Sequence, residues 1–103
     1  MDSVDIIGKV YRIEWVDRKQ GDGDYGECFA DECRIEVALF QCEQQRMDTL
    51  LHECLHAVDH ELHCGLSEPQ TRRMATGLLA LLRQNPALVA FLTGKLSAQS
   101  QGI

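Results

Sequence analysis

His52-Glu53-Cys54-Leu55-His56 forms an H-E-x-x-H pattern, and it lies in a stretch without Gly or Pro, residues 43–62. Residues four apart share one face of a helix, so the two histidines can direct their imidazoles at one metal ion. Glu53 then lies beside the open coordination position, where its carboxylate can accept a proton from water. The pattern therefore predicts a helix that carries a metal site with a general base next to it.

The residues around this pattern favour an amphipathic helix over about Glu43–Leu62. Two stripes with three- and four-residue intervals run along it on neighbouring faces, one apolar and one polar. The apolar stripe consists of Met47, Leu51, Leu55, Val58 and Leu62, and the polar stripe of His52, His56, Asp59 and His63. We expect the apolar stripe to face a core and the polar stripe to carry the chemistry. The alternative is a surface helix that happens to be rich in histidine.

Alternating side chains ahead of this helix predict β-strands. In residues 6–16, β-branched and aromatic residues place Tyr11, Ile13 and Trp15 on one apolar side. Residues 27–30 form a candidate short strand, and residues 33–39 alternate as the last strand before the helix. The predicted fold class is α+β, with a small N-terminal antiparallel sheet of about three strands packed on the motif helix.

Two further helices are predicted after the motif helix. Gly65 is suited to ending that helix, and Ser67 with Gln70 forms a capping box that starts the next one. This helix runs to about Gln84, and Asn85-Pro86 separates it from a short helix over residues 86–92. The expected buried face of the longer helix, which ends at about Gln84, consists of Met74, Leu78, Leu81 and Leu82. Residues 1–96 are expected to form one domain, and the polar residues 97–103 a disordered tail.

Composition limits the partners and the compartment. The 103 residues carry a net charge of −6, which disfavours binding to nucleic acid or to an anionic membrane. The N-terminal residues are acidic and lack the apolar run of a signal peptide. Five cysteines, an odd number, predict reduced thiols and a cytoplasmic location, with most of the thiols buried as small apolar groups.

The third metal ligand has several candidates. Catalytic zinc sites use three protein ligands, and a metzincin site would need Gly and His where Asp59 and Leu62 stand. Glu68 is the preferred candidate, although a Glu in the first turn of a helix also suits the helix dipole. Coordination by Glu68 requires the turn to recover roughly 9 Å of offset along the helix axis. His63 is the main alternative, followed by Asp59 or His60; Asp59 is better suited to orienting the His56 ring.

Residues 34–92 resemble the small H-E-x-x-H proteins of phages and prophages, which are minimal gluzincin-like zinc metalloproteases. The resemblance rests on the strand 34–37, the run 49–57, and Leu66-Ser67-Glu68 at the start of the next helix. More distantly, the chain is similar to the ImmA/IrrE-type metallopeptidase domain. The resemblance implies zinc held by His52, His56 and a downstream Glu, with Glu53 as the general base. It also implies that the strand before the motif helix binds extended substrate along its edge, in the cytoplasm of a bacterial host.

Two functions remain open on the sequence. The first is a zinc-dependent peptidase or other amide hydrolase acting on protein or peptide, in which Glu53 takes a proton from water. The second is a catalytically silent module that keeps the metalloprotease scaffold for binding a host protein. Glu53 favours the enzyme, because a structural metal site does not need it, whereas a chain this short has little wall for a specificity cleft.

Overall fold

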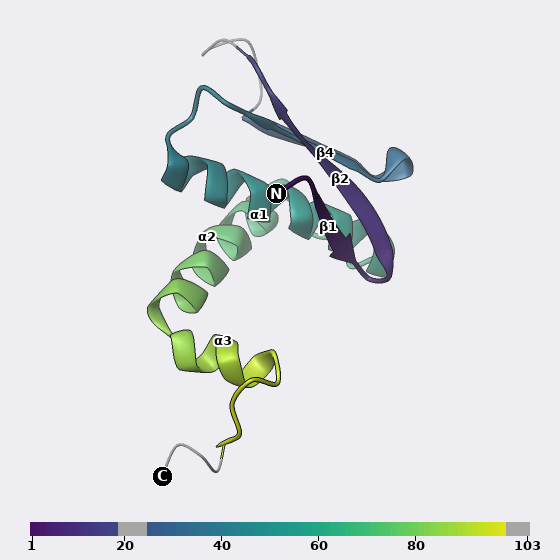
Figure 1. The fold of residues 1–103 in the computed structure, drawn as a ribbon. Coiled ribbons are helices and arrows are strands. Elements are labelled where there is room, and N and C mark those ends of the chain that lie inside the picture. Colours follow the sequence, from purple (N-terminus) through teal and green to yellow (C-terminus); the bar gives the residue numbers. More distant parts are fainter. Residues whose placement is uncertain (19–24, 99–103) are drawn as a thin grey trace.

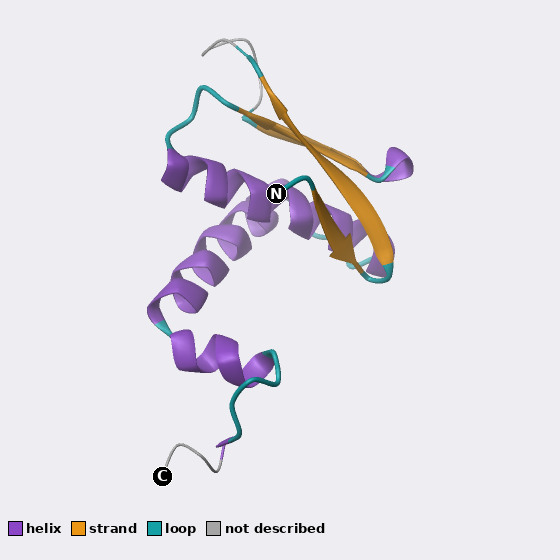
Figure 2. Ribbon diagram, in the orientation of Figure 1, coloured by secondary structure: helices purple, strands orange, loops and turns teal. Residues whose placement is uncertain are grey.

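The computed structural model describes residues 1–18 and 25–98, and its elements follow the predicted order of strands first and helices second (Figures 1 and 2). The chain is α+β, as predicted. Its elements are β1 (Ser3–Ile6), β2 (Lys9–Val16), β3 (Gly26–Phe29), the 3-10 turn Ala30–Glu32, β4 (Arg34–Ala38), α1 (Glu43–Leu62), α2 (Glu68–Gln84) and α3 (Pro86–Leu92).

The three helices begin and end where local signals predicted. α1 ends because His63 adopts a left-handed conformation (φ 53°) and donates its backbone N–H to the carbonyl of Asp59. α2 starts at the capping box, in which Gln70 N donates to Ser67 Oγ (3.2 Å) and Ser67 N to Gln70 Oε1 (2.8 Å). Pro86 opens α3, where its missing N–H is not needed.

The sheet has four strands, in the order β1-β2-β4-β3, and contains one parallel pairing. The predicted strand 6–16 is interrupted because Ile7 and Gly8 both have positive φ (49° and 79°), which makes a two-residue hairpin turn between β1 and β2. β2 and β4 pair in parallel, where the sequence predicted only antiparallel neighbours. β3 pairs antiparallel with the other side of β4 and forms an edge of the sheet.

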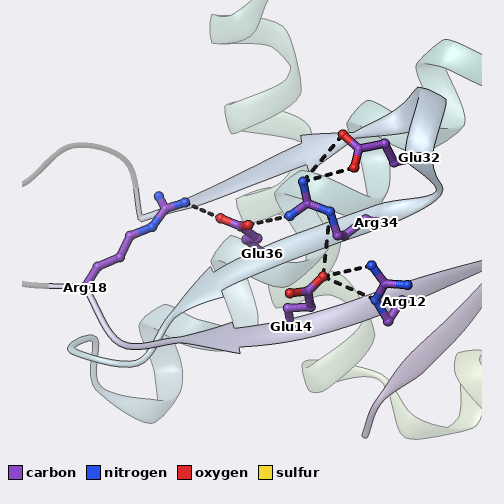
Figure 3. Close-up of polar contacts among 6 residues, drawn as sticks. All are labelled: Arg12, Glu14, Arg18, Glu32, Arg34 and Glu36. Carbon is purple, nitrogen blue, oxygen red and sulfur yellow. Dashed lines mark hydrogen bonds and ion pairs between the residues drawn. The ribbon is translucent and has the colours of Figure 1, made fainter.

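One face of the sheet packs on α1 and the other carries charge. Tyr11, Ile35 and Val37 are fully buried and form a core with Ile6 of β1 and Ala57 of α1, so the predicted apolar side of β2 is confirmed. On the opposite face the alternate residues form a ladder of ion pairs (Figure 3). Its members are Arg12, Glu14, Arg18, Glu32, Arg34 and Glu36. This polar face leaves the α1 side as the only apolar face of the sheet's two central strands.

The predicted buried stripe of α1 is wrong at both of its ends, because Met47 and Leu62 are exposed. The buried residues of α1 are instead Thr49, Glu53 and Ala57, one helical turn apart. Leu50, Cys54 and Val58 pack beside them against the core of the sheet. The sheet therefore covers a face that includes small and polar residues, which a hydropathy pattern does not single out.

α2 crosses α1 on the side away from the sheet, and then leads to α3 far from the strands (Figure 1). Its buried residues are Thr71 and Ala75, whereas Met74 and Leu81, predicted to be buried, are exposed. Leu78 and Leu82 are half-buried, and no residue from 76 to 98 is buried. No single helix in the described ranges has the length and apolar composition of a membrane span, although α2 and α3 reach both together with a 101° bend between them. Most of the expected tail, residues 99–103, lies outside the described residues.

Candidate metal centre

His52 and His56 point their imidazoles at one another from successive turns of α1. Their Nε2 atoms are 3.0 Å apart, and the ring centroids 4.8 Å apart with an interplanar angle of 63°. Both side chains are mostly covered by protein. The four-residue spacing has therefore brought two nitrogen donors to one point, as predicted.

Glu68, at the start of α2, adds a carboxylate to the two imidazoles. Its Oε1 lies 2.8 Å from His52 Nε2, and its Oε2 lies 2.8 Å from His56 Nε2. The turn recovers the axial offset because His63 and Gly65 (φ 75°) both take left-handed conformations, and Asp59 Oδ1 accepts the N–H of Leu66 at 3.2 Å. Two imidazole nitrogens and one carboxylate thus converge from two helices.

The other candidate ligands lie elsewhere around this turn. His63 is exposed at the end of α1, and the structure uses its backbone to end the helix. His60 is also exposed, with Nε2 3.8 Å from Asp31 Oδ1. The bond shown for the Asp59 carboxylate is to the turn that presents Glu68, so its action on the His56 ring stays a prediction.

Glu53 lies beside the two histidines and is only 6% exposed. The ligand atoms of His52, Glu53 and His56 are all within 4.8 Å of one another, and such a group could hold a metal ion. A β-carbon added at Gly26 would meet Thr49 Cγ2 at 2.7 Å, Glu36 O at 2.8 Å and Glu53 Cγ at 3.4 Å. The absence of a side chain at Gly26 therefore lets the start of β3 close over Glu53.

His52, Glu53, His56 and Glu68 line a cleft of about 830 Å³. α1 contributes the residues from Gln45 to His60 that line it, β3 and the residues beside it form one wall, and Glu68 and Arg72 of α2 stand on the other side. The guanidinium of Arg72 lies 4.0 Å from Glu68. Arg72 thus places a cation within reach of the carboxylate that faces the histidines.

The accessible edge beside the histidines belongs to β3. The prediction that residues 33–39 provide this edge is wrong, because β4 is paired on both sides. Ala38 N donates to Tyr25 O at 2.8 Å, and bonded pairs alternate along an antiparallel ladder. The backbone N–H and C=O groups of Gly26 and Cys28 therefore point away from β4, towards the open side of the sheet.

Gln41 and Thr49 connect the start of β3 to α1, and no pattern in the sequence singled them out. Gln41 Nε2 donates to Tyr25 O (2.9 Å) and to Ala38 O (2.8 Å), while Thr49 Oγ1 donates to Gln41 Oε1 (2.6 Å). Both side chains are buried, and Thr49 lies one turn before Glu53. This network ties the wall of the cleft to the helix that carries His52, Glu53 and His56.

The thiols of Cys28, which lines the cleft, and of Cys54, next to Glu53 in the chain, are protonated at neutral pH. Burial raises the pKa of Cys28 to about 12 and that of Cys54, inside the motif, to about 11, and the charge of Glu53 adds to both shifts. All five cysteines are free, and Cys42 and Cys64 are exposed, so the prediction that most are buried is wrong. A protonated thiol is a poor ligand and nucleophile, which leaves the chemistry to imidazoles and carboxylates.

Scans of protein families, curated proteins and solved structures give no match to this chain. The class that the fold and the site define is therefore an α+β protein with a His/Glu/His group that could hold a metal ion. A more particular function has to be proposed from the geometry of the site.

Proposed function

We propose that this chain is a zinc-dependent peptidase or amide hydrolase, with Glu53 as its general base. The observation that carries the proposal is the contact of Glu68 with both histidines, one carboxylate oxygen at 2.8 Å from each Nε2. Two His and one Glu make a ligand set of catalytic zinc sites. A buried carboxylate next to that set, inside a cleft, is what a hydrolase needs and a structural site does not.

The donor atoms of these three residues fit a zinc ion. Zinc ligands at about 2.0–2.1 Å in tetrahedral geometry are about 3.3 Å from one another. The two nitrogens are 3.0 Å apart and each lies 2.8 Å from a different oxygen of Glu68, so these separations would widen by about half an ångström or less. Metal binding requires both Nε2 atoms to be unprotonated, and a cation between them and the carboxylate would then offset the repulsion between their lone pairs.

The chemistry follows from the neighbours of this group. Zinc, when bound, supplies a Lewis acid that polarises an amide carbonyl and makes water more acidic. Glu53 accepts the proton of a water molecule whose oxygen adds to the carbonyl carbon. Glu53 then returns this proton to the nitrogen that leaves as the C–N bond breaks. The buried position of Glu53 keeps other water away from the carboxylate.

The edge of β3 supports an extended peptide as substrate. The outward N–H and C=O groups of Gly26 and Cys28 can pair with a peptide backbone that lies along the cleft. Arg72, on the other side of the cleft, can contact the carbonyl oxygen as it gains negative charge. The five free thiols fit a reducing compartment such as the cytoplasm.

Metal analysis of the purified protein tests the ligand set. We expect close to one zinc per chain, none in the His52→Ala/His56→Ala double variant, and zinc affinity reduced about 100-fold or more in Glu68→Ala. His63→Ala is the matched control and should bind as the parent does. If His63→Ala loses zinc and Glu68→Ala keeps it, the proposed ligand set is wrong.

Catalysis is tested with Glu53→Gln, which keeps the shape of the side chain but cannot take up a proton. The wild type and the variant, both loaded with zinc, are incubated with a mixture of unstructured peptides, and new termini are counted by mass spectrometry. We expect cleavage by the wild type and a loss of about 100-fold or more in the variant. Equal results for the two proteins would favour the alternative, a catalytically silent module that binds a protein in the same cleft.

A further inference from the structure

We propose that residues 76–98 form an arm through which two copies of this chain associate. The arm comprises α2 beyond its last buried residue, α3, and the residues that follow, and it extends away from the sheet (Figure 1). Thirteen of its 23 residues are apolar, yet none of the 23 is buried. Leu81, Phe91 and Leu92 are 46%, 48% and 64% exposed. A surface of this kind marks a place of association.

The last helix of the arm, α3, lacks the packing that would stabilise it. α3 has seven residues, Pro-Ala-Leu-Val-Ala-Phe-Leu, without a buried residue and without a side-chain hydrogen bond at its N-cap. Isolated helices shorter than about 12 residues are marginal in water, and most helices in proteins depend on packing of an apolar face. The radius of gyration is 15.3 Å, whereas a compact domain of this length has about 13 Å. The packing that α3 needs must therefore come from another molecule.

Charge favours a second copy as that molecule. The arm contains two cations, Arg83 and Lys95, and no acidic residue. Residues 1–75 contain 16 Asp or Glu and eight Lys or Arg. Their net charge is therefore −8, whereas the net charge of the arm is +2. A dimer through the cleft would bring two acidic surfaces together, and on the polar face of the sheet the charges already pair within one chain. A dimer through the arms instead brings each positively charged arm closer to the net negative charge of its partner. An anionic membrane would attract the arm but repel the rest of the chain.

The arm also offers a surface that is complementary to itself. On α2, Met74 and Leu81 are exposed with Gly77 between them, and nothing lies within 4 Å of a β-carbon built at Gly77. A glycine at this place lets a second helix approach closely. The 101° bend between α2 and α3 gives each arm an angle into which the arm of a two-fold related copy can fit.

Sedimentation of the full chain tests the proposal. At about 100 μM, above the micromolar constants of weak interfaces, we expect a mass of twice 11.6 kDa. In Leu81→Glu/Phe91→Glu the dissociation constant should rise about 30-fold or more. The control is Val10→Glu, which puts one such charge at an exposed apolar residue of the sheet and should dimerise as the parent does. Circular dichroism checks that each variant keeps α1 and α2, and a loss of helix limited to the seven residues of α3 is expected in the arm variant, because that variant loses the packing that α3 needs.

Three results would overturn the proposal. They are a wild type that stays monomeric at about 100 μM, an arm variant that dimerises as well as the parent, and a Val10→Glu variant that dissociates. Flotation with vesicles of equal parts phosphatidylcholine and phosphatidylglycerol tests the other possible binding partner of the arm, a lipid surface. A monomeric wild type that floats, together with an arm variant that does not, would assign the arm to a lipid surface instead.

Discussion

The cleft and the arm differ in which side chains they bury. Around the cleft, polar side chains are buried and bonded, as Gln41 and Thr49 are to each other and to two backbone carbonyls. In the arm, apolar side chains such as Leu81 and Phe91 are left in contact with solvent. The first region is complete within one chain, while the second has no core of its own. The stability of the monomer should therefore depend on the sheet and α1, with little contribution from the arm.

The largest expected difference is between one buried and one exposed apolar side chain. Ile35 is fully buried, so Ile35→Ala should lower the free energy of unfolding by about 2–5 kcal/mol. Leu81→Ala, in the arm, should change it by less than about 0.5 kcal/mol. Urea unfolding at concentrations where the chain is monomeric measures both. An equal loss in the two variants would mean that the arm belongs to the monomer's core.

Alanine at two glycines should have effects of opposite sign. At Gly26 the new methyl would meet a backbone oxygen at 2.8 Å and Thr49 Cγ2 at 2.7 Å, so Gly26→Ala should cost about 1–3 kcal/mol. At Gly77, inside α2, nothing lies within 4 Å, and Gly77→Ala should stabilise the monomer by about 0.5–1 kcal/mol. Thermal unfolding compares the two. A tolerated Gly26→Ala would show that β3 does not close tightly over α1.

The polar network beside the cleft should be worth about 1–3 kcal/mol. Gln41→Leu keeps much of the volume but leaves the carbonyls of Tyr25 and Ala38 and the hydroxyl of Thr49 without this partner. The matched change outside the sheet is Thr76→Val, which removes an exposed bond to Asp48 (3.2 Å) and should have little effect. A double-mutant cycle of Gln41→Leu with Thr49→Val should show coupling. Additive effects would contradict the network.

The smallest expected effect is a pH dependence at the far end of α1. Glu61 accepts the hydroxyl of Tyr11 at 2.8 Å and pairs with Lys9 at 3.0 Å. The bond from Lys9, followed by that from Tyr11, lowers the pKa of Glu61 below its ordinary 4.5. A lowered folded-state pKa adds stability above the unfolded value and loses it as pH falls through the folded value. Glu61→Gln should therefore flatten the decline, below pH 4.5, of the free energy of unfolding measured in urea.

The parts of this fold that were predicted from sequence depend on local signals. Gly65, the Ser67–Gln70 capping box and Pro86 act on their own helix ends, and the three helix ranges were predicted correctly. The parallel pairing of β2 with β4 and the edge position of β3 depend on segments far apart in the sequence. Hydropathy also misjudged which faces of α1 and α2 are covered, because coverage depends on where the neighbouring layer ends.

The candidate site was also predicted only in part, where it depends on local spacing. His52, Glu53 and His56 follow from spacing on one helix, and the structure brings them together. Glu68 could not be separated from His63, because the choice depends on the left-handed conformations of His63 and Gly65, which turn the chain so that α2 packs back on α1. The wall of the cleft was assigned to the wrong strand for a similar reason. Nothing in the order of the strands says that the third one in the chain lies outside the fourth.

The direct pairing of β2 with β4 makes the third strand an insertion in the chain but an added edge strand in the sheet. β3 pairs only with the outer side of β4, so the pairing of β2 with β4 contains none of its residues. A lineage could therefore lengthen, shorten or replace β3 and the residues beside it, and so change the wall beside the histidines, without moving His52, His56 or Glu68. The residues that would choose a binding partner and those that would do the chemistry are free to diverge at different rates.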